Sequence, residues 1–229
     1  MKIYITGDVH GDIDMRKFNT SQFPYKTKKD DIVIVTGDMG VCWNERKDRF
    51  IRKWFDEKPW TTVFCDGNHE NFEILNNFPV EEWNGGKVHK INESLIHLMR
   101  GEIYNIDNKT YFVMGGAFSH DKQFRKPYVS WWPEELPSND ELKHAEKNLK
   151  QVNYKVDYII SHCCSSSIQS EIDETFKTDH LTDWFDFIED NVMFEKWYFG
   201  HYHIDHTVDK SHICLYDEII PIGANPYKK

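Results

Sequence analysis

The sequence predicts an α/β fold, in which a mixed sheet or two packed sheets are flanked by helices. Short runs of β-branched and aromatic residues alternate with amphipathic helical patterns in the first part of the chain. Several of these runs are apolar throughout, which is typical of strands covered on both faces. A run of strand patterns follows between residues 88 and 114, and this change of order indicates a mixed sheet or two sheets. The 229 residues fit one domain, predicted to span 1–229.

Eight strands are expected, at residues 3–6, 32–36, 61–65, 94–99, 110–114, 157–161, 196–199 and 212–216. The first helix is expected over 44–58, with Asn44 as its N-cap, Pro59 as its end, and residues 50, 51, 54 and 55 on one face. The second is expected over 138–152, because Ser138 and Glu141 have the spacing of a capping box. A third, aromatic-faced helix is expected over 181–191.

The segment 126–137 combines three prolines with Tyr128, Trp131 and Trp132. A loop of this length inside a compact domain is usually functional or disordered, and its aromatic residues favour order. Two interpretations remain open for it. It is either a lid over a site or a packing loop that covers the edge of a sheet.

Composition restricts the classes of partner. The net charge of −10 argues against a broad basic face for duplex nucleic acid, although metal-binding carboxylates contribute to that charge. No secretory signal and no run long enough to span a membrane is visible, so no membrane partner is expected. The five irregularly spaced cysteines indicate free thiols in a reducing compartment, and we therefore expect a cytoplasmic protein. The sequence does not indicate an oligomeric state.

Five short polar clusters each follow a strand-like apolar run. In chain order they are Gly7-Asp8-Val9-His10-Gly11, Gly37-Asp38, Gly67-Asn68-His69-Glu70, Ser161-His162 and Gly200-His201-Tyr202-His203. Each cluster alone is compatible with ordinary turn chemistry. Together they supply oxygen and nitrogen donors without a thiolate, a set that suits two divalent cations side by side. Such a pair, about 3.5–4 Å apart, is the usual apparatus for displacement at phosphorus.

Individual residues in these clusters suggest individual roles. The Asp38 carboxylate has two oxygens and could bridge two cations. The Asn68 amide oxygen is a weak neutral ligand, of the kind found where a site stays open to substrate. His69 directly follows Asn68 and ordinarily titrates near neutral pH, which suits proton donation to a leaving alkoxide. Glu70 is interpreted as a residue of a first helical turn, placed there by the helix dipole.

The ordered motifs D-x-H, G-D, G-N-H-E, H and G-H-x-H resemble the calcineurin-like metallophosphoesterase superfamily, in particular small bacterial or phage members of its Ser/Thr protein phosphatase-like branch. The resemblance implies a four-layered αββα sandwich of two mixed sheets, with two metals at the carboxyl ends of its strands. It also implies ligand sets, in which Asp8, His10 and His203 bind one metal, Asn68, His162 and His201 bind the other, and Asp38 bridges them. A hydroxide held between the ions would attack phosphorus, and His69 would protonate the leaving oxygen.

The chain departs from the phosphoprotein phosphatase pattern in two motifs. That branch has G-D-x-V-D-R-G in the second motif, whereas residues 37–43 here read GDMGVCW. The Asp that would orient the catalytic His and the Arg that would bind phosphate are both missing, and Asn71 follows the third motif in place of an Arg. Asp66 is a candidate for the orienting role. Arg125 or Lys122 is a candidate for the phosphate clamp, and Arg125 is taken as the substrate-binding residue.

The sequence therefore predicts a dinuclear metal-dependent phosphoesterase that hydrolyses a phosphomonoester or a small phosphodiester. Its substrate would be a phosphorylated small molecule, a nucleotide or a phosphopeptide. The metals could be Mn, Fe, Zn, Ni or Co, with Mn favoured. One alternative is a single-strand nuclease or nucleotide phosphodiesterase, because the aromatic residues of 128–132 could stack on a base. The non-enzymatic alternative is a scaffold that keeps the metals for structural purposes.

Overall fold

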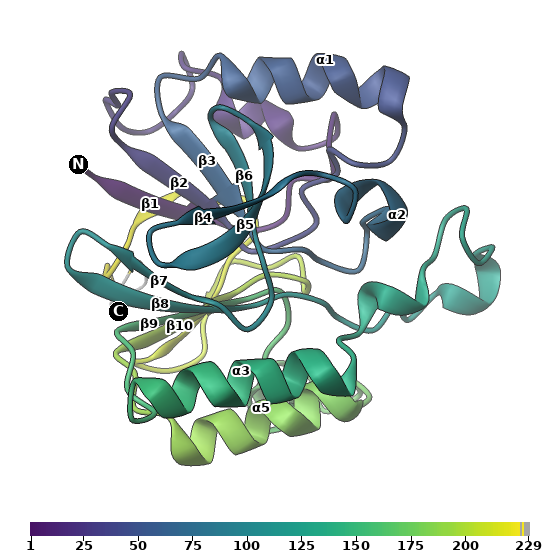
Figure 1. Ribbon diagram of the computed structural model, residues 1–229. Coiled ribbons are helices and arrows are strands. Elements are labelled where there is room, and N and C mark those ends of the chain that lie inside the picture. The colour runs from purple at the N-terminus through teal and green to yellow at the C-terminus, as the bar shows by residue number, and fades with distance from the viewer. Residues whose placement is uncertain (225, 227–229) are drawn as a thin grey trace.

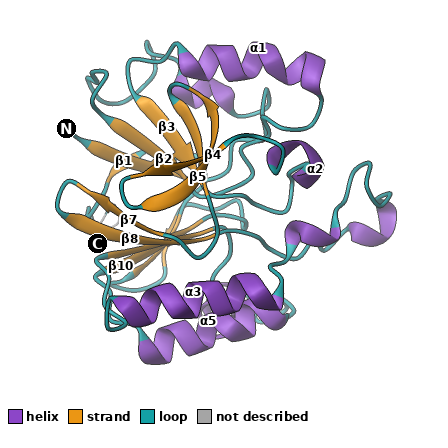
Figure 2. Cartoon of the chain, in the orientation of Figure 1, coloured by secondary structure: helices purple, strands orange, loops and turns teal. Residues whose placement is uncertain are grey.

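The computed structural model of the chain describes residues 1–224 and 226. Two sheets pack face to face, and helices cover both outer faces (Figure 1). Helix α1 lies on the outer face of one sheet, while α3 and α5 lie side by side on the outer face of the other (Figure 2). The four-layered αββα sandwich of two mixed sheets is thus confirmed. The predicted domain 1–229 extends to residues 225 and 227–229, which lie outside the described residues.

In the described part of the chain, the first sheet has seven strands in the order β13-β1-β2-β3-β6-β5-β4. Strands β1, β2, β3 and β6 run parallel, while β13, β5 and β4 are antiparallel to their neighbours. The strands are β1 (Ile3–Thr6), β2 (Ile32–Val35), β3 (Thr61–Phe64), β4 (Val80–Trp83), β5 (Gly86–Asn92), β6 (Leu95–Leu98) and β13 (Ile220–Pro221).

The second sheet has six strands within the described residues, in the order β11-β12-β10-β9-β8-β7. Strands β8, β9, β10 and β12 run parallel, and β7 and β11 are antiparallel edge strands. The strands are β7 (Ile103–Ile106), β8 (Lys109–Met114), β9 (Tyr158–Ser161), β10 (Lys196–Phe199), β11 (His206–Thr207) and β12 (His212–Cys214).

All eight predicted strands are present, most of them within a residue of the expected bounds. The sequence analysis missed β4, β5, β7, β11 and β13 as separate strands. Three of the missed strands, β4, β5 and β7, belong to hairpins whose tight turns have positive φ at both central residues. These turns are Asn84-Gly85 between β4 and β5, and Asp107-Asn108 between β7 and β8.

The helices follow the capping signals of the sequence. The helices are α1 (Glu45–Asp56), α2 (Phe72–Leu75), α3 (Asn139–Gln151), α4 (Ser166–Ile172) and α5 (His180–Asn191), with 3-10 turns η1 (Met15–Phe18), η2 (Lys122–Phe124) and η3 (Pro133–Glu135). Asn44 caps α1, and the Ser138–Glu141 capping box begins α3, both as predicted. The expected inward position of Phe50 is wrong, because its side chain is exposed on α1 while Ile51 and Phe55 are buried.

Three apolar cores hold the layers together. Alternate residues of one strand serve two of them: Ile3 and Ile5 of β1 face the space between the sheets, while Tyr4 faces the core under α1. A third core joins the second sheet to α3, α4 and α5, with Trp197 and Phe185 fully buried in it. The apolar runs are continuous because both faces of these strands are covered. Among the described residues, no helix has the length and apolar character needed to cross a bilayer.

The segment that follows β8 projects from the sandwich beyond α2 and the start of α3 (Figure 1). Its outer part exposes Phe124, Tyr128 and Val129. Its returning part is buried, since Trp132 packs against Trp43 with ring centroids 5.4 Å apart. Segment 126–137 is thus ordered: one half projects and the other half packs.

A buried ion pair ties this segment to the first sheet. Asp66, which follows β3, accepts hydrogen bonds from Arg100 Nε at 2.9 Å and Arg100 Nη2 at 2.6 Å. Arg100 Nη2 also donates to the Glu134 carbonyl oxygen at 2.8 Å. Burial raises the pKa of Asp66, but Arg100 and His97 outweigh it and hold that pKa below its ordinary value. The pair therefore fixes the loop after β3, the end of β6 and the returning segment together.

Replacing Arg100 by methionine should lower the free energy of unfolding by about 3–5 kcal/mol, because Asp66 would remain buried without its guanidinium partner. Urea denaturation at pH 7 measures this. Arg49→Met, at an exposed position of α1, is the matched control and should change the free energy by less than about 0.5 kcal/mol. Equal effects of the two substitutions would contradict a stabilising role for the buried pair.

Candidate metal centre

The predicted donor residues all follow parallel strands, and the fold brings these strand ends to one edge of the sandwich. The donors and the strands they follow are Asp8 and His10 after β1, Asp38 after β2, Asn68 after β3, His162 after β9, and His201 and His203 after β10; the predicted catalytic His69 also follows β3. Strands β1, β2 and β3 are neighbours in the first sheet, and β9 and β10 are neighbours in the second. Each sheet therefore supplies part of the donor set, at the carboxyl ends of its strands.

One group of donors is built around Asp8. His203 Nε2 lies 3.2 Å from Asp8 Oδ2, and His10 Nε2 lies 3.9 Å from the same oxygen. The two imidazole nitrogens are 3.0 Å apart. One carboxylate and two imidazoles, with ligand atoms within 4.8 Å of one another, form a donor set suited to a divalent cation.

The second group is built around His162. Its Nε2 lies 3.4 Å from Asp38 Oδ2 and 3.1 Å from Asn68 Oδ1. Its Nδ1 lies 2.8 Å from the Thr36 carbonyl oxygen and donates to it, so Nε2 is the nitrogen that faces the oxygens of Asp38 and Asn68. The His201 ring packs edge-on to His162, with centroids 5.0 Å apart.

The two groups are adjacent, and both carboxylates lie between them. Asp38 Oδ2 is 3.9 Å from His10 Nδ1, and Asp8 Oδ1 is 3.8 Å from His162 Nδ1. Asp8, Asp38 and His162 also place ligand atoms within 4.8 Å of one another. By distance Asp8 thus belongs to both groups, whereas the family resemblance assigns the shared position to Asp38.

The electrostatics of the site favour a bound cation. Burial raises the pKa values of Asp8 and Asp38, but the adjacent His162, together with His203 and His201 N–H at Asp8 and with His69 and His10 at Asp38, outweighs it, so both pKa values lie below the ordinary value. Burial lowers the pKa of His162, but Asp38 and Asp8 outweigh that effect and raise it to about 10. Burial, reinforced by His162, lowers the pKa of His201 to about 3. Two buried carboxylates need positive charge beside them, and a divalent cation can replace the proton of His162.

The loop backbones hold the carboxylates in place. His201 N donates to Asp8 Oδ1 at 3.1 Å, and His69 N donates to Asp38 Oδ1 at 2.7 Å. Both contacts depend on a preceding glycine: a Cβ on Gly200 would collide with Asp8 Oδ1, and a Cβ on Gly67 would collide with Asp38 Oδ1. This explains the glycines directly before His201 and Asn68.

Four of the predicted ligands adopt left-handed backbone conformations. The φ angles are 49° for His10, 46° for Asp38, 69° for His201 and 51° for His203. Non-glycine residues adopt this region infrequently, and such residues cluster at functional sites. The strand therefore ends abruptly at each of these motifs, and the side chains turn toward the shared edge.

The orientation of the Asn68 amide is fixed by a pair of residues that the sequence analysis did not identify. Asn68 Nδ2 donates to Ser119 Oγ at 3.0 Å, and Ser119 Oγ donates to Glu135 Oε2 at 2.5 Å. Because the hydroxyl proton is given to Glu135, Ser119 can only accept from the amide. Asn68 must then present its oxygen, rather than its nitrogen, to the donor group around His162.

His69 lies beside the metal donors and contacts Arg125, whose Nη2 is 2.8 Å from His69 Nε2. The guanidinium only donates, so His69 Nε2 accepts. Burial lowers the pKa of His69, Arg125 adds to the effect, and Asp38 opposes it. Arg125 is itself held by Asp121 at 2.8 Å. The open cleft has a volume of about 270 Å³ and is lined by Asp38, Asn68, His69, His120, Asp121, Arg125, His201 and His203.

Three other sequence-based assignments need correction. Asp66 does not orient His69, because its carboxylate is engaged by Arg100 and His97. Glu70 precedes α2, which Asn71 caps; it is fully buried and accepts a hydrogen bond from Met39 N at 2.8 Å. Lys122 lies over the Phe118 and Trp131 rings rather than toward the donors.

Lys17, a residue that the sequence analysis missed, holds the backbone of the loop that carries Asp8. Its Nζ donates to the carbonyl oxygens of Asp8 at 2.7 Å and Tyr216 at 2.5 Å. Burial lowers the pKa of Lys17 to about 8, although Asp8 opposes the shift. The five cysteines are free and buried in the described chain, and the Cys163 and Cys164 thiols point to Gly116 O and Tyr202 OH instead of the donors.

Comparison with known proteins agrees with the motifs. The sequence pattern described as calcineurin-like phosphoesterase matches residues 1–205. No curated protein matches the chain. Among solved structures, the chain is similar to a Staphylococcus aureus protein provisionally assigned as a 5′-nucleotidase and solved in complex with alpha-ketoglutarate, at 14% identity and a TM-score of 0.47. That match covers 93% of this chain and 48% of the other, so the chain spans about half of its length.

Removal of the Ser119 hydroxyl should weaken the binding of one cation and spare the other. In Ser119→Ala the Asn68 amide loses the partner that fixes its orientation, and we expect the affinity of one site to fall about tenfold. Isothermal titration of the metal-free chain with Mn²⁺ resolves the two events. Ser130→Ala, in the same projecting segment, is the control. Unchanged titrations for Ser119→Ala would rule out this positioning role.

Cation uptake should release protons, because the metal-free site holds a proton on His162 up to about pH 10. Between pH 6.5 and 8.5 the Mn²⁺ affinity should therefore rise, by about tenfold per pH unit for each proton displaced. Titrations in buffers with different enthalpies of ionisation count these protons. An affinity that does not change over this range would show that no proton is displaced.

Proposed function

The chain belongs to the calcineurin-like phosphoesterase family, and from this premise we propose that it is a dinuclear metal-dependent hydrolase of phosphomonoesters or small phosphodiesters. The observation that carries the proposal is the pair of adjacent donor groups at the shared edge of the two sheets, with the Asp8 carboxylate common to both. Their oxygen and nitrogen donors, with two buried carboxylates among them, fit divalent cations.

Asp8, His10 and His203 would hold one ion, and Asn68, His162 and His201 would hold the other, with Asp38 between them. Bound divalent cations neutralise negative charge on phosphoryl oxygens and make water more acidic. Mn²⁺ is the cation we favour, because the donor set is carboxylate, amide and imidazole. Substrate binding and proton donation would be carried out by side chains of the cleft that are not ligands.

Arg125 and His69 are the residues proposed to act on the substrate. Arg125 donates to His69 Nε2 in the free site at 2.8 Å. A phosphoryl group entering the cleft offers better acceptors to the guanidinium, which would move from His69 to the phosphoryl oxygens. His69 Nε2 would then be free to carry a proton to the leaving oxygen, and burial makes that proton acidic.

A nucleotide phosphodiesterase or single-strand nuclease is the second candidate. It is favoured by Phe124 and Tyr128, which are exposed by 85% and 59% beside Arg125 and can stack on a base. Trp132, by contrast, is buried and excluded from this role. Rates on nucleoside monophosphates, cyclic nucleotides and a single-stranded oligonucleotide, measured with the same metal, separate these activities from hydrolysis of simple phosphate esters.

The roles of Asp8 and His69 are separable by the leaving group. Asp8→Asn should abolish turnover of both p-nitrophenyl phosphate and phenyl phosphate. His69→Ala should lower kcat/KM on phenyl phosphate by about 10²–10⁴-fold, and by less on p-nitrophenyl phosphate, whose leaving group is already a stable anion.

His206→Ala, at an exposed histidine of β11, is the control for both substitutions and should retain activity. Equal losses on the two substrates would show that His69 positions the substrate rather than protonating it. If Asp8→Asn were as active as the unmodified chain, the metal centre would have no part in the reaction.

A further inference from the structure

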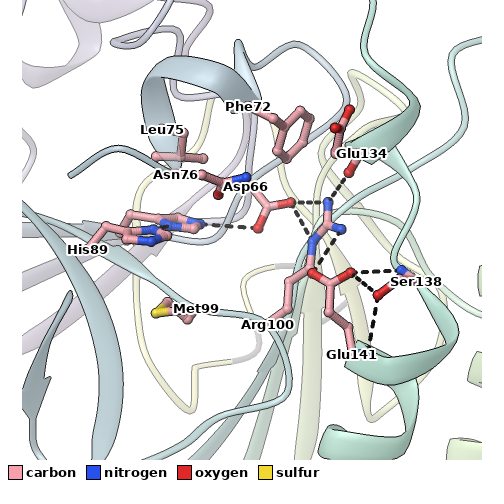
Figure 3. Close-up of a pocket in the computed structure, with 11 residues that line it drawn as sticks. Asp66, Phe72, Leu75, Asn76, His89, Met99, Arg100, Glu134, Ser138 and Glu141 are labelled. Atoms are coloured by element: carbon pink, nitrogen blue, oxygen red, sulfur yellow. Dashed lines mark hydrogen bonds and ion pairs between the residues drawn. The ribbon is translucent and has the colours of Figure 1, made fainter. Parts of the chain in front are cut away.

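A second cavity lies behind the loop that carries Asn68 and His69, around Asp66 (Figure 3). Its volume is about 350 Å³, which is within the range of small-molecule sites. Residues of α2, β5, the end of β6 and the start of α3 line it, and none of them lines the cleft of the metal centre. The cavity is therefore a separate site rather than an extension of the phosphoesterase cleft.

A chain of hydrogen bonds brings an acceptor to the wall of this cavity. Asp66 Oδ1 lies 3.1 Å from His97 Nε2, and His97 Nδ1 lies 2.9 Å from His89 Nδ1. In the tautomer in which His97 Nε2 donates to the carboxylate, His97 Nδ1 accepts and His89 Nδ1 donates. His89 Nε2 is then an acceptor.

His89 Nε2 forms no hydrogen bond with any residue of 1–224 or 226. His89 is only 5% exposed, and it lines the cavity. Burial, together with His97, lowers the pKa of His89 to about 4, so the ring is neutral at pH 7. An acceptor that faces the cavity without a protein partner can receive a hydrogen bond from a ligand that brings a donor.

The charge around the cavity favours the same kind of ligand. Three carboxylates, those of Asp66, Glu134 and Glu141, line it together with one guanidinium, that of Arg100. Arg100 is already occupied, because it binds Asp66, the Glu134 carbonyl oxygen at 2.8 Å and Glu141 Oε1 at 3.4 Å, and it lies between these groups (Figure 3). An anion would find little free donor capacity here and an excess of negative charge.

The opposite part of the wall is apolar. Phe72 and Leu75 of α2 are buried and line the cavity together with Met99. Phe72 faces the Arg100 guanidinium with its ring, 5.2 Å from Cζ to the centroid. An aromatic wall opposite acidic groups suits a flat or apolar body that carries a cationic head.

We propose that this cavity binds a small organic cation, an amine or amidine attached to an apolar or aromatic group, whose N–H groups donate to His89 Nε2 and the carboxylates of Glu134 and Glu141. The site is independent of the phosphate chemistry, because its charge repels phosphate esters. The ligand's apolar part would lie against Phe72, Leu75 and Met99.

Benzamidine is the probe, and the full-length metal-free chain is the target, so that the result does not depend on phosphoesterase activity. Backbone amide NMR with increasing benzamidine should shift signals of residues 72–76, 89 and 97–100 in a saturable manner. Benzoate, which has a similar shape and the opposite charge, should shift none of them. Absence of saturable shifts, shifts confined to 120–125, or equal binding of benzoate would overturn the proposal.

A charge-removing variant tests the assignment without disturbing the interior. Glu134 is exposed at the rim, and Glu134→Gln should weaken benzamidine binding about threefold. Glu73→Gln, at an exposed position of α2 outside the lining, is the matched control and should leave binding unchanged. Equal effects of both variants would show a nonspecific attraction of the cation to an acidic surface and would also overturn the proposal.

Discussion

Two buried carboxylates, Asp8 and Asp38, impose the constraint on which the rest of the structure depends. Charged groups are rarely left in an interior without compensation. Here both carboxylates come from the first sheet, while His162 and His203, which lie beside them, come from the second. The site is therefore complete only when the sheets pack with the carboxyl ends of β1, β2, β9 and β10 at one edge. Backbone N–H donors and the adjacent glycines then hold the carboxylates at this edge.

The sequence predicted the parts of the molecule that are encoded locally. Each candidate donor lies within a few residues of the end of a strand, so the order of motifs was sufficient to predict the fold and to propose the donors. Ser119 and Glu135 were missed because Ser119 contacts Asn68 from 51 residues further along the chain, and Glu135 acts on Asn68 only through Ser119. The Asn84-Gly85 turn was a readable hairpin signal that the analysis did not use. Glu70 was misplaced because its burial depends on the loop after β2.

The projecting segment reconciles the two interpretations offered for residues 126–137. Its returning half is a structural part of the interior: Trp132 packs on Trp43, and Glu135 holds Ser119 beside the donor loop. Its outer half presents Phe124 and Tyr128 to solvent beside Arg125. One continuous segment thus packs against the sandwich with one half and projects beside the cleft with the other. The buried half anchors the exposed half to the sandwich.

Four candidate ligands, His10, Asp38, His201 and His203, have left-handed backbone conformations. This conformation lowers the stability of the fold, whereas the side chains serve the proposed chemistry. At each of these positions glycine would relax the main chain and at the same time remove a donor. Selection for thermal stability alone would therefore favour glycine at these four positions. Such variants would keep the sandwich fold but lose side chains that the proposed ions need. On the proposed function, these four positions keep a donor side chain at the expense of an unfavourable main-chain conformation.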